Sequence, residues 1–199
     1  VDGSTFQMYM ANMKSIFMDM IKNTDMVIFN RCKKEDPLPT YRRGIKVANQ
    51  RAEVIFEDEE GELGDIFQDE MPFDMNAPVI EILPEDYGIW FVDAMDHPEN
   101  YEGKTVKFKA RVMKPRGMGS KFFVPGRTAM TCCADDTTFL GYVCKSAYAP
   151  KLTPGEWVEV TAKVGIEKRN EYQGEEGIVL SAEHVEQCDP LEDEMVYFN

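Results

Sequence analysis

The stretch TVKFKARVMK, from Thr105 to Lys114, decides the fold of the larger part of this 199-residue chain. Its apolar residues fall on every second position, at Val106, Phe108, Ala110 and Val112. In a strand, successive side chains point to opposite faces, so one face of this segment is apolar and the other is basic. We therefore predict a strand that packs one face on a core.

Further strand candidates follow the first, separated by glycine, proline, asparagine and aspartate. They are KFFVPGRTAMT at 121–131, FLGYVCKSAY at 139–148, EWVEVTAKVGIEKR at 156–169 and GIVLSAEHVEQC at 177–188. Strands of this number and length can close a small barrel of the OB type. We predict such a five-stranded OB-like barrel over residues 84–199, with a leading helix that stops near His97 and Pro98.

The residues before the barrel follow a different pattern. Apolar residues at spacings of three and four predict a helix over 5–23 whose apolar face packs in a core: Phe6, Met10, Met13, Phe17 and Met20 or Ile21. The short apolar runs DMVIFN (25–30) and AEVIFE (52–57) are typical of parallel strands buried on both faces. A helix is predicted between them over 38–50, so we expect an α/β arrangement for residues 1–57. Residues 58–83 are predicted to be an acidic linker and a strand. The predicted fold class of the whole chain is α+β.

The charge and the cysteine content limit the function classes. A net charge of −14 disfavours a chain that coats nucleic acid over its whole surface. No apolar run is long enough to span a bilayer, and five cysteines without regular spacing do not form a secreted disulfide scaffold, so we expect a cytoplasmic protein without membrane insertion. The sequence begins with Val1, and we expect it to be a processed chain or part of something longer.

The segments VDGSTF (1–6), NTDMVIFNRC (23–32) and AEVIFE resemble the second half of the GTPase domain of the CobW family, the metallochaperone-type GTPases related to HypB and UreG. The resemblance aligns Asp2 with a strand-ending aspartate and Asn30 with the start of the guanine-reading motif. It implies half of a P-loop GTPase-like sheet without the phosphate-binding loop. Asn30 is then the remaining cofactor-binding position, and GTP would bind only in a longer parent protein.

Most of residues 84–198 resembles the C-terminal domain of the YcgQ-type proteins, the soluble piece carried by permease partners. The resemblance rests on HPENYEGKTVKFKARV (97–112), FFVPGRTAMTCCADD (122–136), LGYVC (140–144) and GEWVEVTAKV (155–164). It implies a link to transporters and to metal or ion homeostasis. A metal-transport protein or a metalloprotein is the partner that both resemblances favour.

The phrase TCCADD (131–136) is the best candidate for a metal site. Zinc binds thiolates and carboxylates, and the candidates here are Cys132, Cys133 and Asp135, with Cys144 from the next strand. On a regular strand, however, adjacent side chains point to opposite faces, so two adjacent thiols share one ion only at a bulge or a turn. A core thiol with a chance neighbour, and a redox pair, are the alternatives.

The basic face of the first barrel strand suggests a second kind of site. It carries Lys107, Lys109 and Arg111, and Lys114, Arg116 and Lys121 lie in the following loop. Aromatic platforms for single-stranded nucleic acid are available at Phe122, Phe123 and Tyr142. The alternatives are a stripe neutralised by the acidic linker of the same chain, or a face that is only solvated.

We therefore interpret the chain as a non-catalytic binding module of a metallochaperone-type metal-homeostasis protein, with zinc as the expected metal and no catalytic residues of its own. One alternative is the C-terminal fragment of an active CobW-like GTPase whose nucleotide site lies upstream. The other is an OB-fold binder of single-stranded nucleic acid. Half of a parallel sheet leaves apolar surface uncovered, so we also expect either self-association through residues 1–57 or poor order in that region.

Overall fold

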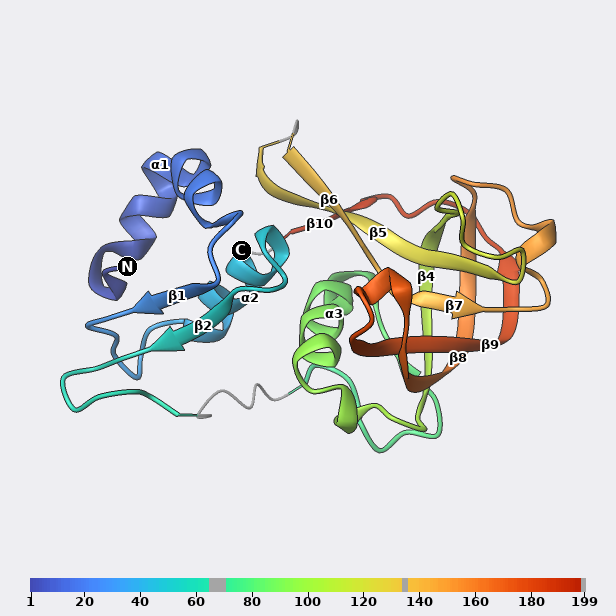
Figure 1. The fold of residues 1–199 in the computed structure, drawn as a ribbon, viewed down its shortest axis with the longest axis horizontal. Helices are drawn as coiled ribbons and strands as arrows, with labels where there is room; N and C mark the ends of the chain where they lie inside the picture. The colour runs from blue at the N-terminus through green and yellow to red at the C-terminus, as the bar shows by residue number, and fades with distance from the viewer. Residues whose placement is uncertain (65–70, 134–135, 198–199) are drawn as a thin grey trace. The chain divides into compact units, whose positions relative to one another are not determined.

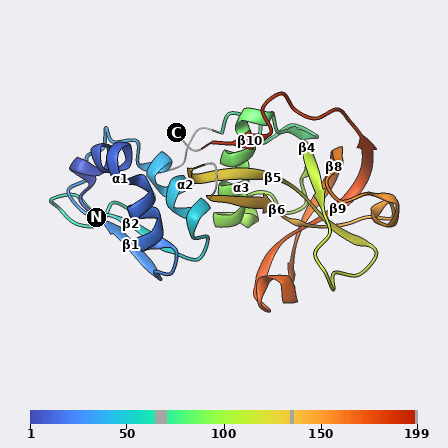
Figure 2. The same ribbon diagram turned by 90° about the horizontal axis from the view of Figure 1, so that it is seen from above.

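The chain divides into two units inside the predicted acidic linker, between Glu70 and Met71. The computed structural model describes residues 1–64, 71–133 and 136–197, without the side chains of Cys132 and Cys133. The first unit holds Val1–Glu70 together with Ala129–Thr138 and Tyr197–Asn199, and the second holds Met71–Thr128 and Phe139–Val196. Figures 1 and 2 show the elements of both units. None of the described helices is long and apolar enough to cross a membrane.

The second unit is a closed barrel. Within the described residues its five strands are β4 (Thr105–Met113), β5 (Phe122–Cys133), β7 (Val143–Lys145), β8 (Trp157–Lys168) and β9 (Glu176–Gln187). They pair in the order β4-β5-β7-β9-β8, and β8 returns to β4 (Figure 1). All the neighbours are antiparallel except β7 and β9, which are parallel. This is a five-stranded barrel of the OB type, so the predicted fold class is confirmed.

Side-chain alternation on β4 follows the predicted pattern. The side chains of Val106, Phe108, Ala110 and Val112 are buried. Strand β8, which pairs with β4 over seven positions from Thr105 to Arg111, buries every second residue in the same way, at Val158, Val160, Ala162 and Val164. The period-two apolar residues of both strands therefore form the barrel core.

Helix α3 (Tyr87–Asp96) packs on this barrel. The Trp90 and Phe108 rings lie 4.8 Å apart between centroids, and the Tyr87 hydroxyl donates a hydrogen bond of 3.0 Å to the Leu140 carbonyl. Tyr142 donates to the carbonyl of Phe91 on the same helix. Before α3, the short strand β3 (Ile80–Glu81) pairs with β4 in parallel.

Two elements of the barrel differ from the prediction. The predicted strand over 139–148 is two strands, because β6 (Asp136–Gly141) pairs with β5 and β7 begins after Tyr142, whose ring turns into the core against α3. The strand β10 (Met195–Val196) was not predicted, and it also pairs with β5. The buried guanidinium of Arg127 donates hydrogen bonds to the carbonyls of Asp193 and Met195 and so holds this segment.

The first unit contains a parallel strand–helix–strand motif. Strand β1 (Met26–Phe29) pairs in parallel with β2 (Glu53–Phe56), and α2 (Leu38–Ala48) connects them. Helix α1 (Phe6–Ile21) packs in the same core as α2, with Phe6 in contact with Phe29 and Tyr41. The α/β pattern predicted for these residues is therefore present in a small form.

Two predictions about this core were wrong. Strand β1 is buried on one face only, since Met26 and Ile28 are 45% and 40% exposed. On α1, Met13 is exposed and Met18, which was not predicted, is buried; at the predicted position Met20 or Ile21, Ile21 is the buried residue. Met13 has non-helical backbone angles (φ −138°, ψ 27°), and a kink there rotates the second half of the helix relative to the first.

The first part of the predicted linker is folded onto the first unit. The Leu63 amide donates a 2.8 Å hydrogen bond to the Phe56 carbonyl, and Glu57 and Glu62 form an isolated bridge. The Leu63 side chain packs against the core of this unit. Residues 65–70, which include part of the acidic run, lie outside the described residues.

Candidate functional site

Two loops of the barrel enclose a cleft of about 590 Å³ in the second unit. The first loop, residues 114–121, joins β4 to β5, and the second, residues 169–175, joins β8 to β9. The charged, aromatic and sulfur-containing residues that line the cleft are Arg116, Met118, Phe122, Lys168, Arg169 and Glu171. In OB barrels, the face next to these two loops is where oligonucleotides and oligosaccharides bind.

Arg169 forms a fixed platform in this cleft. Its guanidinium carbon lies 4.3 Å from the centroid of the Phe122 ring, which is a cation–π contact. The same guanidinium donates hydrogen bonds of 3.2 and 3.1 Å to the carboxylate of Glu171, and Glu167 lies 3.8 Å away. The bond with Glu171 raises the pKa of Arg169, and the bond with Arg169 lowers the pKa of Glu171. The two contacts hold the plane of the guanidinium in place.

Other cations lie around this platform without a carboxylate partner. Arg116, Lys121 and Lys168 are exposed, and within the described residues none of them forms an ion pair. Lys145 is also exposed, and it is the register partner of Phe122 across β5 and β7. The cleft therefore combines an aromatic surface, a fixed arginine and free positive charge.

The basic strand face predicted from the sequence is mostly neutralised. The ammonium group of Lys107 lies 2.9 Å from the Glu159 carboxylate on the neighbouring strand, and this pair raises the pKa of Lys107. Arg111 lies 3.7 Å from Glu194. Within the described residues, these acids come from β8 and the C-terminal segment. The face is therefore a poorer anion site than the cleft, because Lys107 and Arg111 are already paired with acids.

The aromatic residues predicted as platforms separate in the structure. Phe123 is fully buried, and Tyr142 is 6% exposed with its ring stacked on Phe91. Phe122 is the member of the three that reaches the cleft, where Arg169 covers one side of its ring.

The predicted metal ligands do not all come together. Cys144 is fully buried, and burial raises the pKa of its thiol to about 12. It pairs with Phe123, nine positions along β5 from Cys132, which is about 30 Å on an extended strand. Asp135 and the side chains of Cys132 and Cys133 lie outside the described residues. In the part of the chain that is described, no group of His, Cys, Asp or Glu could hold a metal ion.

Residues 62–198 match the family described as the DUF1980 C-terminal domain. The chain belongs to this family. The match includes all of the barrel and its leading helix, so the YcgQ-like resemblance of the second part is confirmed at the level of the DUF1980 domain. It begins after the α/β motif of the first unit, and the CobW-like resemblance of residues 1–57 stays a prediction.

Solved structures resemble the DUF1980 chain only distantly. The mitochondrial single-stranded DNA-binding protein Rim1 of S. cerevisiae is 10% identical, with a TM-score of 0.27 over 44% of this chain and 97% of its own. Aspartyl-tRNA synthetases of Entamoeba histolytica and Leishmania major are 15% and 18% identical, with TM-scores of 0.30 and 0.29. They overlap 59% and 58% of the DUF1980 chain, which spans 27% and 21% of their length. No curated protein matches the chain.

Asn30, the predicted cofactor-binding residue, lies in the first unit and forms backbone hydrogen bonds with the N-terminal residues. Its amide donates a 2.9 Å hydrogen bond to the Val1 carbonyl, and its carbonyl accepts one of 2.8 Å from Gly3. The next residue, Arg31, has a left-handed backbone (φ 57°) and pairs with the carboxylate of Asp2. Asp2 and Asn30 thus lie side by side, and Arg31 binds the aspartate.

The second loop of the DUF1980 cleft was missed in the sequence. Its residues, RNEYQGE at 169–175, follow a predicted strand and contain turn formers, so they read as an ordinary connection. The signal was present, however, because an OB barrel places the loop after its fourth strand next to the loop after its first. Pairing Lys168 and Arg169 with the loop at 114–121 would have identified the cleft.

Proposed function

We propose that this DUF1980 domain is a non-catalytic binding module that holds a short stretch of single-stranded nucleic acid between the loops at 114–121 and 169–175. The observation that carries the proposal is the Phe122–Arg169 stack, at 4.3 Å, in a cleft lined by Arg116 and Lys168 and adjoined by Lys121. None of these three cations forms an ion pair within the described part of the chain. A base stacks on flat aromatic or guanidinium surfaces, and its phosphates lie along positive charge.

The chemistry of the cleft favours a single strand over other anions. A free phosphate would interact only with the cations of the cleft. Phe122 and Met118 also offer apolar surface, on which a base or another flat group can pack. Glu171 neutralises part of the charge of Arg169, so this arginine contributes its plane more than its charge. The remaining cations are few, and we expect weak binding without strong base preference.

The number of cations sets the salt dependence of binding. Three phosphate contacts on a single strand give a slope of about −2 in a plot of log affinity against log salt concentration. Affinity for an oligothymidylate should then fall by about 15-fold to 20-fold between 50 and 200 mM salt. The net charge of −14 adds repulsion outside the cleft, which makes low salt the right starting condition.

Fluorescence anisotropy with a labelled 12-nucleotide oligothymidylate tests this proposal. Arg116→Ala and Lys168→Ala should each weaken binding and reduce the salt slope by about 0.7. Lys163→Ala is the matched control, because Lys163 is an exposed lysine on β8 that does not line the cleft. Absence of binding at 20 mM salt, or equal losses for Lys163→Ala and Lys168→Ala, would remove the cleft as a nucleic-acid site.

A further inference from the structure

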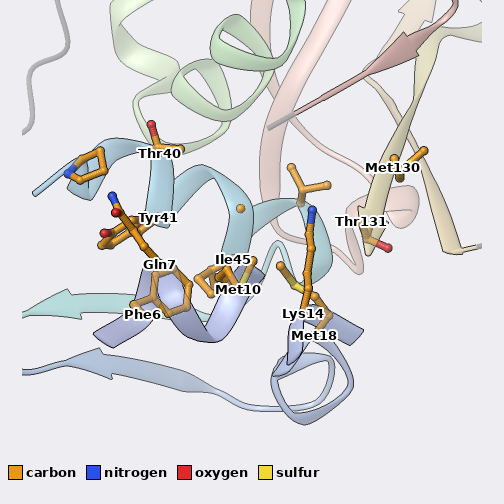
Figure 3. A pocket seen from close by; sticks show the side chains of 13 residues that line it. Phe6, Gln7, Met10, Lys14, Met18, Thr40, Tyr41, Ile45, Met130 and Thr131 are labelled. Carbon is orange, nitrogen blue, oxygen red and sulfur yellow. The ribbon is translucent and has the colours of Figure 1, made fainter. Parts of the chain in front are cut away.

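The first unit contains a separate pocket of about 360 Å³. Helices α1 and α2 form its walls, and Met130 and Thr131 from the end of β5, which belongs to this unit, complete it (Figure 3). Pockets of this size that are mostly apolar and carry a few polar groups are typical small-molecule sites.

The lining is apolar and adaptable. Its apolar side chains are those of Phe6, Met10, Met18, Pro37, Ile45, Val47 and Met130. Three of these seven side chains are methionines, which are unbranched and adjust to ligands of different shape. Such a surface fits a flexible aliphatic chain better than a rigid polar molecule.

The polar groups of the pocket favour an anionic end on that chain. Lys14 brings a positive charge to the lining, and within the described residues it forms no ion pair. The remaining polar lining residues are neutral at physiological pH, since burial raises the pKa of Tyr41 and the others are Gln7, Thr40 and Thr131. Among the described residues, the lining contains no aspartate or glutamate. A cation at an apolar pocket without a competing acid attracts a carboxylate.

We propose that this pocket binds a medium-chain aliphatic carboxylate, with the chain among the methionines and the carboxylate paired with Lys14. The inference is independent of the nucleic-acid site, because no residue of the pocket belongs to the barrel cleft. A neutral alcohol of the same length should bind more weakly, and an alkylammonium ion should be repelled by Lys14.

Gly44 provides a way to block the pocket without harming the fold. It lies inside α2 and lines the pocket, and a Cβ atom placed on it meets nothing within 4 Å. Leucine has a much higher helix propensity than glycine, so Gly44→Leu should fill the pocket and leave the helix at least as stable. Gly44→Ala is the matched control, because it makes the same backbone change but adds only one methyl group.

The test is calorimetric titration of the full chain with decanoate below its micelle-forming concentration. We expect saturable binding that Gly44→Leu abolishes and Gly44→Ala retains, with unchanged circular dichroism in both variants. Lys14→Gln should weaken decanoate by about threefold to fivefold and leave decanol unchanged. Absence of decanoate binding, equal affinity for decanoate and decanol, or undiminished binding by Gly44→Leu would each overturn the proposal.

Discussion

Arg127 is the buried cation on which the end of the barrel domain depends. Its side chain is 2% exposed and donates hydrogen bonds to three backbone carbonyls, those of Pro84, Asp193 and Met195. Its guanidinium also lies 5.6 Å from the centre of the Tyr87 ring. No carboxylate within the described residues forms an ion pair with it, and burial lowers its pKa. Arginine nevertheless stays charged in proteins, so the three carbonyls stabilise a buried positive charge. They accept from its two terminal nitrogens, whereas its Nε has no hydrogen-bond partner within the described residues.

We expect Arg127→Met to destabilise the domain by about 3 kcal/mol. Each buried carbonyl that loses its donor costs about 1–3 kcal/mol. Two effects reduce the sum: methionine removes the cost of burying a charge, and the carbonyls of Asp193 and Met195 can turn to water if the C-terminal segment lifts away. Arg127→Lys keeps the charge but loses the planar fork of donors, so its loss should be smaller.

Urea unfolding and hydrogen exchange measure the two parts of this prediction. The midpoint should fall in the order wild type, Arg127→Lys, Arg127→Met, and backbone amides in residues 189–196 should exchange faster in Arg127→Met before global unfolding. A loss below about 1 kcal/mol together with unchanged exchange in residues 189–196 would refute the claim that Arg127 holds this segment.

Three further predictions concern packing, ionisation and metal. Gly126→Ala should lower the melting temperature by an amount equivalent to about 2 kcal/mol, since its Cβ would lie 2.3 Å from a backbone oxygen, whereas Gly165→Ala, whose Cβ has only ordinary contacts, should not. The folded state favours the protonated thiol of Cys144, so its contribution is complete below the ordinary pKa of 9.0 and is lost as the pH rises toward 12. The urea midpoint should therefore fall more steeply above pH 9 in the wild type than in Cys144→Ala, and equal slopes would contradict the assignment. If the predicted zinc site exists, elemental analysis should find zinc in the reduced, untagged chain. The Cys132→Ser, Cys133→Ser double variant should lose that zinc. A protein that contains no metal after zinc supplementation would exclude the site.

The barrel could be predicted because its strands carry local signals. Apolar and polar residues alternate along 105–113 and 157–164, and this alternation predicts a strand with one buried face without knowledge of its neighbouring strands. The turn-forming residues between the apolar runs mark where the strands end. Five such strands have few ways to close, so the OB type followed from their number and length.

What could not be predicted depends on contacts between distant residues. The kink at Met13 changes which methionines of α1 are buried, and no local pattern marks it. The strand at 195–196 is too short to show a period, and it is fixed by Arg127, nearly seventy residues earlier in the chain. The ion pair of Lys107 with Glu159 likewise depends on strand register, which places an acid opposite one charge of the expected basic face.

The position of the nucleic-acid site is the central claim, and amide chemical-shift mapping tests it most directly. A titration of the isotope-labelled chain with an oligothymidylate at low salt should shift the amides of residues 115–122 and 168–171, which line and adjoin the cleft. The amides of 107–111, whose charges are largely paired, should remain in place. Shifts confined to 107–111, or no shifts at any oligonucleotide concentration, would contradict the account.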